Sequence, residues 1–169
     1  MAKAQLRTIE LKATNNGSSI EIPPPSKKDE LTFHNKMKGD YFFVTFTLKD
    51  ETDQKLRFKP NFADALWVQP LDRTAPCPSQ ACAMAVFEPL YLSPDGTELT
   101  VVNLNDAEQD LGFVLNFESA INPNVTATCD PIVTNKNGGA AAPNSNFLLL
   151  AGAIAAGVAA VAAIVWLNR

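Results

Sequence analysis

Alternating apolar and polar positions, the pattern of half-buried β-strands, recur through the first 134 residues. The clearest strand is predicted at 41–48, where one face is apolar throughout: Phe42, Val44, Phe46 and Leu48. Residues 55–59 alternate charged with apolar side chains, so we expect 41–59 to form a hairpin around the polar turn at 50–54. Residues 5–13 and 18–23 predict a second hairpin, because Asn15-Asn16-Gly17 between them is a strong turn signal.

Further short strands are predicted along the rest of this region, each bounded by Gly, Pro, Asn or Asp. They fall at 30–37, 66–68, 82–92 with a break at Pro89, 98–104, 111–117 and 125–133. No helical periodicity precedes residue 147. The pattern therefore predicts an all-β domain over residues 1–134, built as an antiparallel β-sandwich.

One segment resembles a known family of sandwiches. Residues 98–117, ELTVVNLNDAEQDLGFVLNF, are similar to the passage between strands E and F of immunoglobulin-like and fibronectin-like domains. An L-x-V strand, a short acidic loop and Asp-x-Gly precede the next strand in both. The resemblance implies an immunoglobulin-like sandwich in which Trp67 is the core tryptophan. The corner tyrosine and the following cysteine of that family are absent here.

Residues 147–167, FLLLAGAIAAGVAAVAAIVWL, contain no charge, amide or proline and are apolar on every face. A helix of this length spans roughly 30 Å, the thickness of a bilayer's hydrocarbon core. Trp166 and Arg169 stand at its end, where interfacial anchors belong. We expect one transmembrane helix over 147–167, joined to the sandwich by a flexible linker at 135–146. The alternative is a buried helix of a soluble domain.

Small residues recur every four positions within this apolar segment. They form two adjacent ridges on a helix, the first with Gly152, Ala156 and Ala160 and the second with Ala155, Ala159 and Ala163. Such ridges let helix backbones approach closely. We therefore expect packing against another transmembrane helix, from a second copy or from a different subunit. The alternative is that alanine merely fills a long apolar segment.

Charge is unevenly placed but forms no dense basic cluster. Residues 1–73 hold 12 Lys and Arg against 10 Asp and Glu, a balance of +2, whereas residues 74–169 hold 2 against 8, a balance of −6, which together give the net −4. This distribution argues against nucleic acid as a partner. The N-terminal sequence MAKAQLRTIELK has no apolar signal region. We expect a single-pass, tail-anchored membrane protein with most of the chain on the cytoplasmic side.

Three cysteines and the single histidine suggest a zinc site. Cys77, Cys82, Cys129 and His34 would make a Cys3His zinc set. A disulfide between Cys77 and Cys82 is a second hypothesis. Because no second close pair of cysteines accompanies these two, unlinked thiols are the favoured interpretation. An acidic loop at 103–110 offers oxygen ligands for calcium but lacks EF-hand spacing, so a solvated turn is expected there.

The sequence contains no motif of a familiar catalytic class. It has no Gly-x-Ser-x-Gly elbow, phosphate-binding glycine loop or dinucleotide fingerprint. We therefore predict a protein that is not an enzyme and needs no cofactor. The first hypothesis is a membrane-tethered module whose β-sandwich binds a protein partner. The alternative is a small accessory subunit, whose helix packs into a larger membrane complex and whose sandwich caps it.

Overall fold

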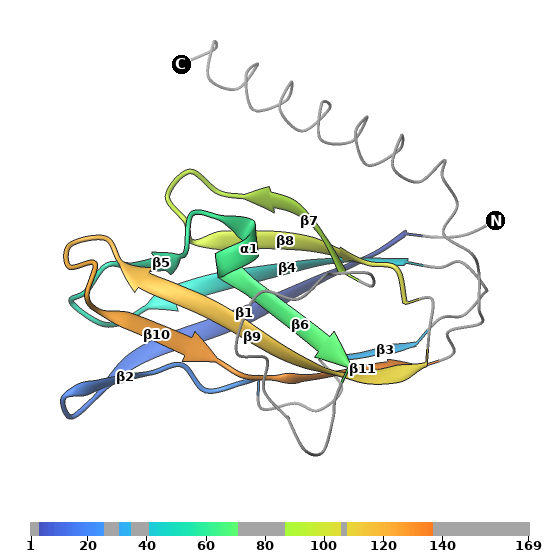
Figure 1. Cartoon of the computed structure of the whole chain (residues 1–169), viewed down its shortest axis with the longest axis horizontal. Coiled ribbons are helices and arrows are strands. Elements are labelled where there is room, and N and C mark those ends of the chain that lie inside the picture. The colour runs from blue at the N-terminus through green and yellow to red at the C-terminus, as the bar shows by residue number, and fades with distance from the viewer. Residues whose placement is uncertain (1–3, 26–30, 35–40, 71–86, 106–107, 137–169) are drawn as a thin grey trace, which may run out of the picture.

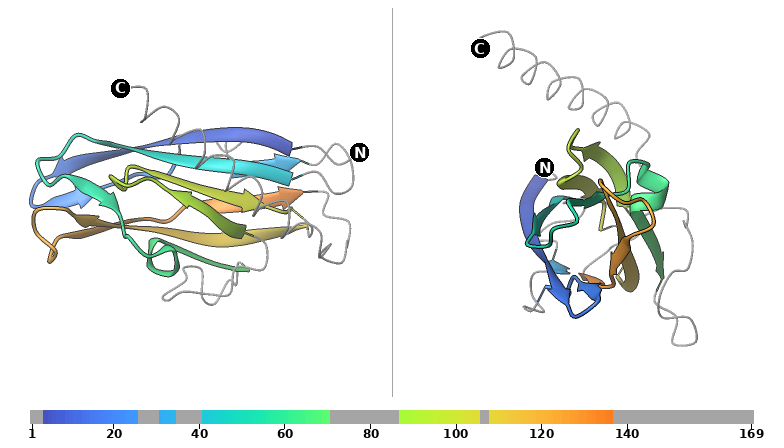
Figure 2. Two further views of the ribbon diagram at one scale, coloured as in Figure 1. Left: turned by 90° about the horizontal axis from the view of Figure 1, so that it is seen from above. Right: turned by 90° about the vertical axis from the view of Figure 1, so that its left-hand side faces the viewer.

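The chain folds into two β-sheets that face each other across a hydrophobic core (Figures 1 and 2). The structure, a computed structural model, describes residues 4–25, 31–34, 41–70, 87–105 and 108–136. Strands dominate these residues, and the one helix among them, α1 (Phe62–Ala65), is a single turn. The predicted all-β, sandwich-like fold is thus confirmed.

The first sheet contains five strands in the order β2-β1-β4-β8-β7. These strands are β1 (Ala4–Asn16), β2 (Ser19–Glu21), β4 (Tyr41–Asp50), β8 (Glu98–Asn103) and β7 (Phe87–Leu92). The predicted β1–β2 hairpin is confirmed, with Gly17 at φ 63° in its turn. The predicted strand at 98–104 is also confirmed as β8.

The second sheet is organised around β9 (Gln109–Ser119). Along one side of β9 lie β10 (Thr126–Cys129) and β11 (Ile132–Lys136), and β3 (Thr32–His34) pairs with β11. Along its other side lie β5 (Leu56–Phe58) and β6 (Leu66–Pro70), with α1 between them. The predicted strand at 125–133 is therefore two strands, because Pro131 between them has no N–H to donate.

Aromatic side chains from both sheets meet in the core. The ring centroids of Phe33 and Phe42 lie 4.9 Å apart, and those of Phe113 and Phe87 lie 5.0 Å apart. Both pairs have the edge-to-face geometry that aromatic rings favour. The apolar face predicted for β4 is buried, with every member at most 8% exposed. Sequence alternation therefore identified the inward side chains of this strand correctly.

The prediction of a purely antiparallel sandwich was wrong, because two strand pairs are parallel. β1 runs parallel to β4 from the pair Ala4–Tyr41 to the pair Ala13–Asp50, and β3 runs parallel to β11. After β2 the chain enters the second sheet through β3 and then returns to the first sheet as β4. Both sheets are therefore mixed. Alternation sets which face of a strand is buried but leaves its neighbour undetermined.

The predicted 41–59 hairpin was also wrong. β4 pairs with β1 and β8, whereas β5 pairs with β9 in the opposite sheet. Asp50 directs this crossing, since its carboxylate accepts hydrogen bonds from the N–H groups of Thr52 at 2.9 Å and Leu56 at 2.8 Å. Lys55, at φ 51°, then turns the chain into β5. The polar turn at 50–54 is real, but it connects two sheets.

Candidate functional site

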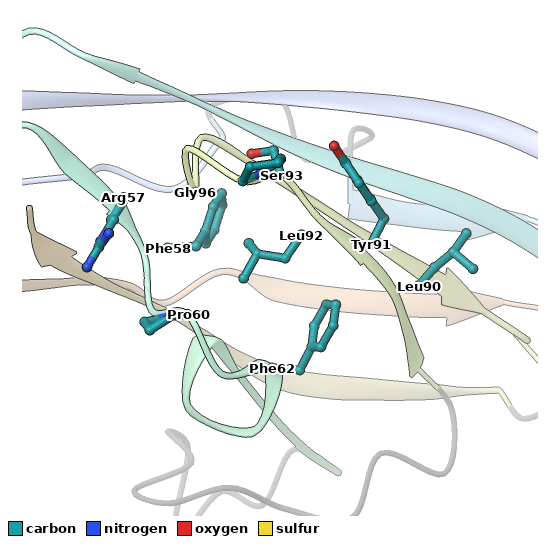
Figure 3. Close-up of a pocket in the computed structure, with 10 residues that line it drawn as sticks. Arg57, Phe58, Pro60, Phe62, Leu90, Tyr91, Leu92, Ser93 and Gly96 are labelled. Carbon is teal, nitrogen blue, oxygen red and sulfur yellow. The ribbon is translucent and has the colours of Figure 1, made fainter. Parts of the chain in front are cut away.

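An open groove of about 490 Å³ lies between the β5–α1 segment and β7 (Figure 3). It is lined by Arg57, Phe58, Pro60, Phe62, residues 90–94 and Gly96. The groove thus runs between one edge of each sheet, where core side chains approach the surface. Phe62 and Leu92 are partly buried and pack against the core from this opening.

One wall of the groove is β7, an edge strand of the first sheet. Among the described strands β7 pairs with β8 alone. Its register slips between Pro89 and Tyr91, and this β-bulge re-aims the side chains that follow. Tyr91 is 40% exposed at the groove, whereas Leu92 returns toward the core (Figure 3).

The opposite wall is formed where the chain leaves β5. Phe58 is fully buried, and after it Pro60 ends the pairing with β9 because it lacks an N–H. Asn61 caps the following turn of helix, its Oδ1 accepting from the N–H of Ala63 at 3.1 Å. This cap fixes the start of α1 and holds Phe62 at the groove.

Arg57 supplies the only charge among the residues that line this groove, and that charge is paired. Its Nη2 lies 2.7 Å and its Nε 3.1 Å from Oε1 of Glu118, directly opposite on β9. The ion pair is partly exposed, so it contributes little to stability. The groove is left with an apolar interior beside a neutralised cation.

The turn between β7 and β8 closes one end of the groove. Oδ1 of Asp95 accepts from the Ser93 hydroxyl at 2.6 Å and from the Thr97 N–H at 3.1 Å. These hydrogen bonds, the one from Ser93 foremost, lower the pKa of Asp95 because they stabilise its carboxylate. The carbonyl oxygen of Gly96, a residue at φ 72°, accepts a hydrogen bond from the N–H of Phe58 at 2.7 Å. The turn is therefore fixed to the opposite sheet.

The lining of the groove is mostly apolar. Its lining residues include no carboxylate, imidazole or thiol, the side chains that most often act as acids, bases or nucleophiles. No pattern in the sequence indicated this groove. Its aromatic residues lie on segments that are far apart in sequence, and only the unpredicted pairing of β5 with β9 brings them opposite β7.

The candidate metal ligands are not gathered among the described residues. His34 is exposed on β3, whereas Cys129 is a free, buried thiol on β10. Burial raises the pKa of Cys129 to about 12, with the neighbouring charge of Asp130 adding to the effect. Cys77 and Cys82 lie outside the described residues. Within the described ranges no three His, Cys, Asp or Glu side chains form a metal-binding group.

The candidate calcium loop is used structurally where the structure describes it. Asn103 and Asn105 are fully buried. Oδ1 of Asn103 accepts from the N–H of Asn105 at 2.9 Å, and Nδ2 of Asn105 donates to the carbonyl of Phe33 at 3.2 Å. These side chains hold the end of β8 against β3.

The expected core tryptophan was a wrong assignment. Trp67 is half-buried on β6, between the inward-facing Leu66 and Val68, and is not part of the core cluster. Its indole N–H donates to the carbonyl of Ala63 in α1 at 3.0 Å. The side chain therefore braces α1 against β6.

The residues expected to act in a membrane all lie outside the described part of the chain. They are the ridge residues Gly152, Ala155, Ala156, Ala159, Ala160 and Ala163 and the interfacial residues Trp166 and Arg169. Across residues 4–136, with their gaps, no helix is long and apolar enough to cross a bilayer. The transmembrane helix at 147–167 stays a prediction from sequence.

The chain matches no protein-family model and no curated protein significantly.

Proposed function

We propose that this protein is a non-catalytic interaction module, tethered to a membrane by residues 147–167, that binds an extended apolar peptide segment of a partner protein. The observation that carries this proposal is the groove beside the edge strand β7. Extended peptides commonly add to such an edge, where backbone hydrogen bonds give affinity and neighbouring pockets select side chains.

The two walls of the groove fit this mode of binding. The described neighbours of β7 leave its outer edge open to a further strand. A peptide lying there would place alternate side chains toward Phe62 and Leu92 and toward solvent. The mostly apolar lining favours aliphatic or aromatic side chains at the inward positions.

An immunoglobulin-like relationship is part of the proposal. β8 and β9, which correspond to strands E and F in the resemblance, lie in opposite sheets, as E and F do in that family. The ten-residue parallel pairing of β1 with β4 is a departure from it. We therefore propose a distant relationship to that family on the arrangement of these two strands.

Peptide selection on the full chain tests the proposal. The protein would be reconstituted in phosphatidylcholine nanodiscs and presented with a library of random extended peptides. We expect selected peptides to carry apolar residues at alternate positions. Leu90→Asp, which places a charge in the wall of the groove, should weaken them by about tenfold or more.

A matched control separates an effect at the groove from a general effect of the added negative charge. Thr128→Asp adds the same charge on an exposed position of β10 and should leave peptide affinity unchanged. Selected peptides that bind both variants as well as the wild type would contradict the proposed groove, as would selection without an alternating pattern.

The alternative function, an accessory subunit, is favoured by the small-residue ridges of 147–167. Purification in mild detergent discriminates between the two. A free module would run alone or as a small oligomer, whereas a subunit would co-purify with other membrane proteins in fixed ratio.

A further inference from the structure

A partly exposed apolar patch, with two exposed and two half-buried side chains, lies at one corner of the first sheet. It consists of Ala4 and Leu6 on β1 and Tyr41 and Phe43 on β4, which are paired laterally as Ala4–Tyr41 and Leu6–Phe43. Leu6 is 85% exposed, the highest value among the large apolar side chains that the structure describes as exposed. The rings of Tyr41 and Phe43 stack edge to face at 5.5 Å. The patch itself contains no charged side chain.

The described chain ends at the same end of the sandwich as the patch. β11 ends at Lys136, which pairs with His34 of β3. Phe33, the residue before His34, packs on Phe42 near the start of β4. Figure 1 accordingly shows the starts of β1 and β4 and the end of β11 at the same end of the sandwich, with the β9–β10 connection at the opposite end. The apolar patch and the exit toward residues 137–169 therefore share one end.

We propose that this patch rests on the lipid surface of the membrane that anchors the chain. The inference rests on the proposed anchor at 147–167, which holds the domain at the membrane. Only residues 137–146 separate Lys136 from that anchor. A segment of that length reaches at most about 35 Å when fully extended, and a flexible one averages about 17 Å. The end of the sandwich that carries the patch is thus held close to the bilayer.

The chemistry of the patch matches that surface. Tyrosine has an apolar ring and a polar hydroxyl, and it is enriched at membrane interfaces for that reason. Phe43 and Leu6 add apolar contact beside Tyr41. Tethering keeps the local concentration of lipid high, so a small apolar contact suffices to orient the domain. Glu88 lies across β8 from Phe43, in the same lateral row, and favours neutral over anionic lipid there.

Photocrosslinking of the full chain in phosphatidylcholine vesicles tests this orientation. A photoreactive benzoylphenylalanine replaces either Leu6 or Ile121, which is 57% exposed in the β9–β10 connection at the opposite end. Flotation first establishes that each protein is bound to vesicles. Illumination and mass spectrometry then measure the lipid adduct. We expect about tenfold more adduct at position 6, since burying one leucine-sized side chain shifts an equilibrium by about that factor or more.

A second variant keeps the test independent of the probe itself. With benzoylphenylalanine at Ala4, Leu6→Asp should lower the lipid adduct several-fold, while Ile121→Asp should leave it unchanged. Because the contact is apolar, the yield should not change with salt concentration.

The outcomes distinguish this inference from the proposed anchor. Protein that floats but gives equal adduct at positions 6 and 121 would overturn the orientation and leave the anchor standing. Crosslinks from position 6 to a second copy would likewise overturn it, in favour of a protein contact. Failure of the wild-type chain to float would overturn the anchor and this inference together.

Discussion

The carbonyl oxygen of Gly96 accepts a hydrogen bond from the N–H of Phe58 at 2.7 Å, and this contact joins the two sheets at the groove. Gly96 belongs to the β7–β8 turn of the first sheet, whereas Phe58 ends β5 in the second. A Cβ atom built on Gly96 would lie 2.8 Å from Cβ of Arg57. The glycine therefore permits both the turn and the close approach of the two sheets.

The first prediction concerns this glycine. Gly96→Ala should lower the free energy of unfolding by about 2 to 4 kcal/mol, because the new methyl group meets the backbone-proximal part of Arg57 and the residue must keep a positive φ. Urea unfolding followed by circular dichroism measures the change. Peptide binding at the groove should weaken as well, since the turn closes one end of it.

Gly17→Ala is the matched control for this change. Gly17 has a similar φ of 63°, but a Cβ there would meet nothing within 4 Å. Only the conformational cost remains, about 1 to 2 kcal/mol. Equal losses in the two variants would show that the contact with Arg57 contributes nothing.

The second prediction concerns the connection that carries the chain between sheets. Asp50→Ala removes the acceptor for the N–H groups of Thr52 and Leu56 and for the Thr52 hydroxyl. We expect a loss of about 1 to 3 kcal/mol in the free energy of unfolding, the usual cost of leaving such groups without a partner. Chemical denaturation of the variant and the wild type in parallel measures this loss.

Asp53→Ala provides the comparison within the same connection. The side chain of Asp53 is exposed and accepts one hydrogen bond, from the amide of Gln54 at 3.2 Å. Its removal should change stability by less than about 0.5 kcal/mol. If Asp53→Ala proved as destabilising as Asp50→Ala, the connection would be held by something other than the Asp50 carboxylate.

The crossing at Asp50 also shows why the sequence predicted faces better than neighbours. Burial alternates along β4 as the apolar pattern predicted, because side-chain direction has a period of two and is local. The partner of β5 is decided by Leu56 and Phe58 packing inward beside β9, a contact between residues about 60 positions apart. Loop chemistry at 50–54 predicts a turn equally well for a hairpin and for a crossing between sheets.

The groove could not be predicted from the sequence either, because it also depends on contacts between residues that are far apart in the chain. Phe58 and Phe62 read as parts of a strand and an irregular segment, and Tyr91 as part of another strand. Only the crossing from the first to the second sheet places them around one opening. A weak signal did exist in the prolines, since Pro60 and Pro89 indicate where ladders end and edges begin.

The third prediction is a pH dependence that originates at Cys129. Burial raises the pKa of this thiol to about 12, above its value of about 8.5 in an unfolded chain. As pH rises from about 8 to about 10, the unfolded state loses this proton while the folded state keeps it. Stability should therefore fall, by about 1 to 2 kcal/mol over this interval from this group alone. Below pH 8 both states keep the proton, and this contribution is flat.

Cys129→Ala isolates that contribution, because other groups titrate over the same range. Urea unfolding of both proteins under reducing conditions, at several pH values, gives the two stability profiles. The variant should be less stable at neutral pH, because of the cavity it leaves, yet should lose less stability toward pH 10. Parallel profiles would mean that the thiol does not titrate in the unfolded state alone, contrary to its burial.

The last prediction concerns the small-residue ridges of the apolar segment, which lies outside the described residues. Gly152→Leu combined with Ala156→Leu raises the hydrophobicity of the segment but fills one ridge. If the ridge packs against another helix, association measured by crosslinking in nanodiscs should fall, because the two backbones lose their close approach. Membrane insertion should stay the same or improve, since leucine partitions into lipid better than glycine or alanine.

Gly157→Leu is the control, compared with Gly152→Leu as a single change. Both replace a glycine in the same apolar segment, but on a helix Gly157 lies roughly 140° away from Gly152, off both ridges. Loss of association in Gly152→Leu alone would therefore locate the contact on the ridge, since hydrophobicity rises equally in both variants. Equal association in all the variants would mean that the small residues are filler and that the segment serves only to anchor the chain.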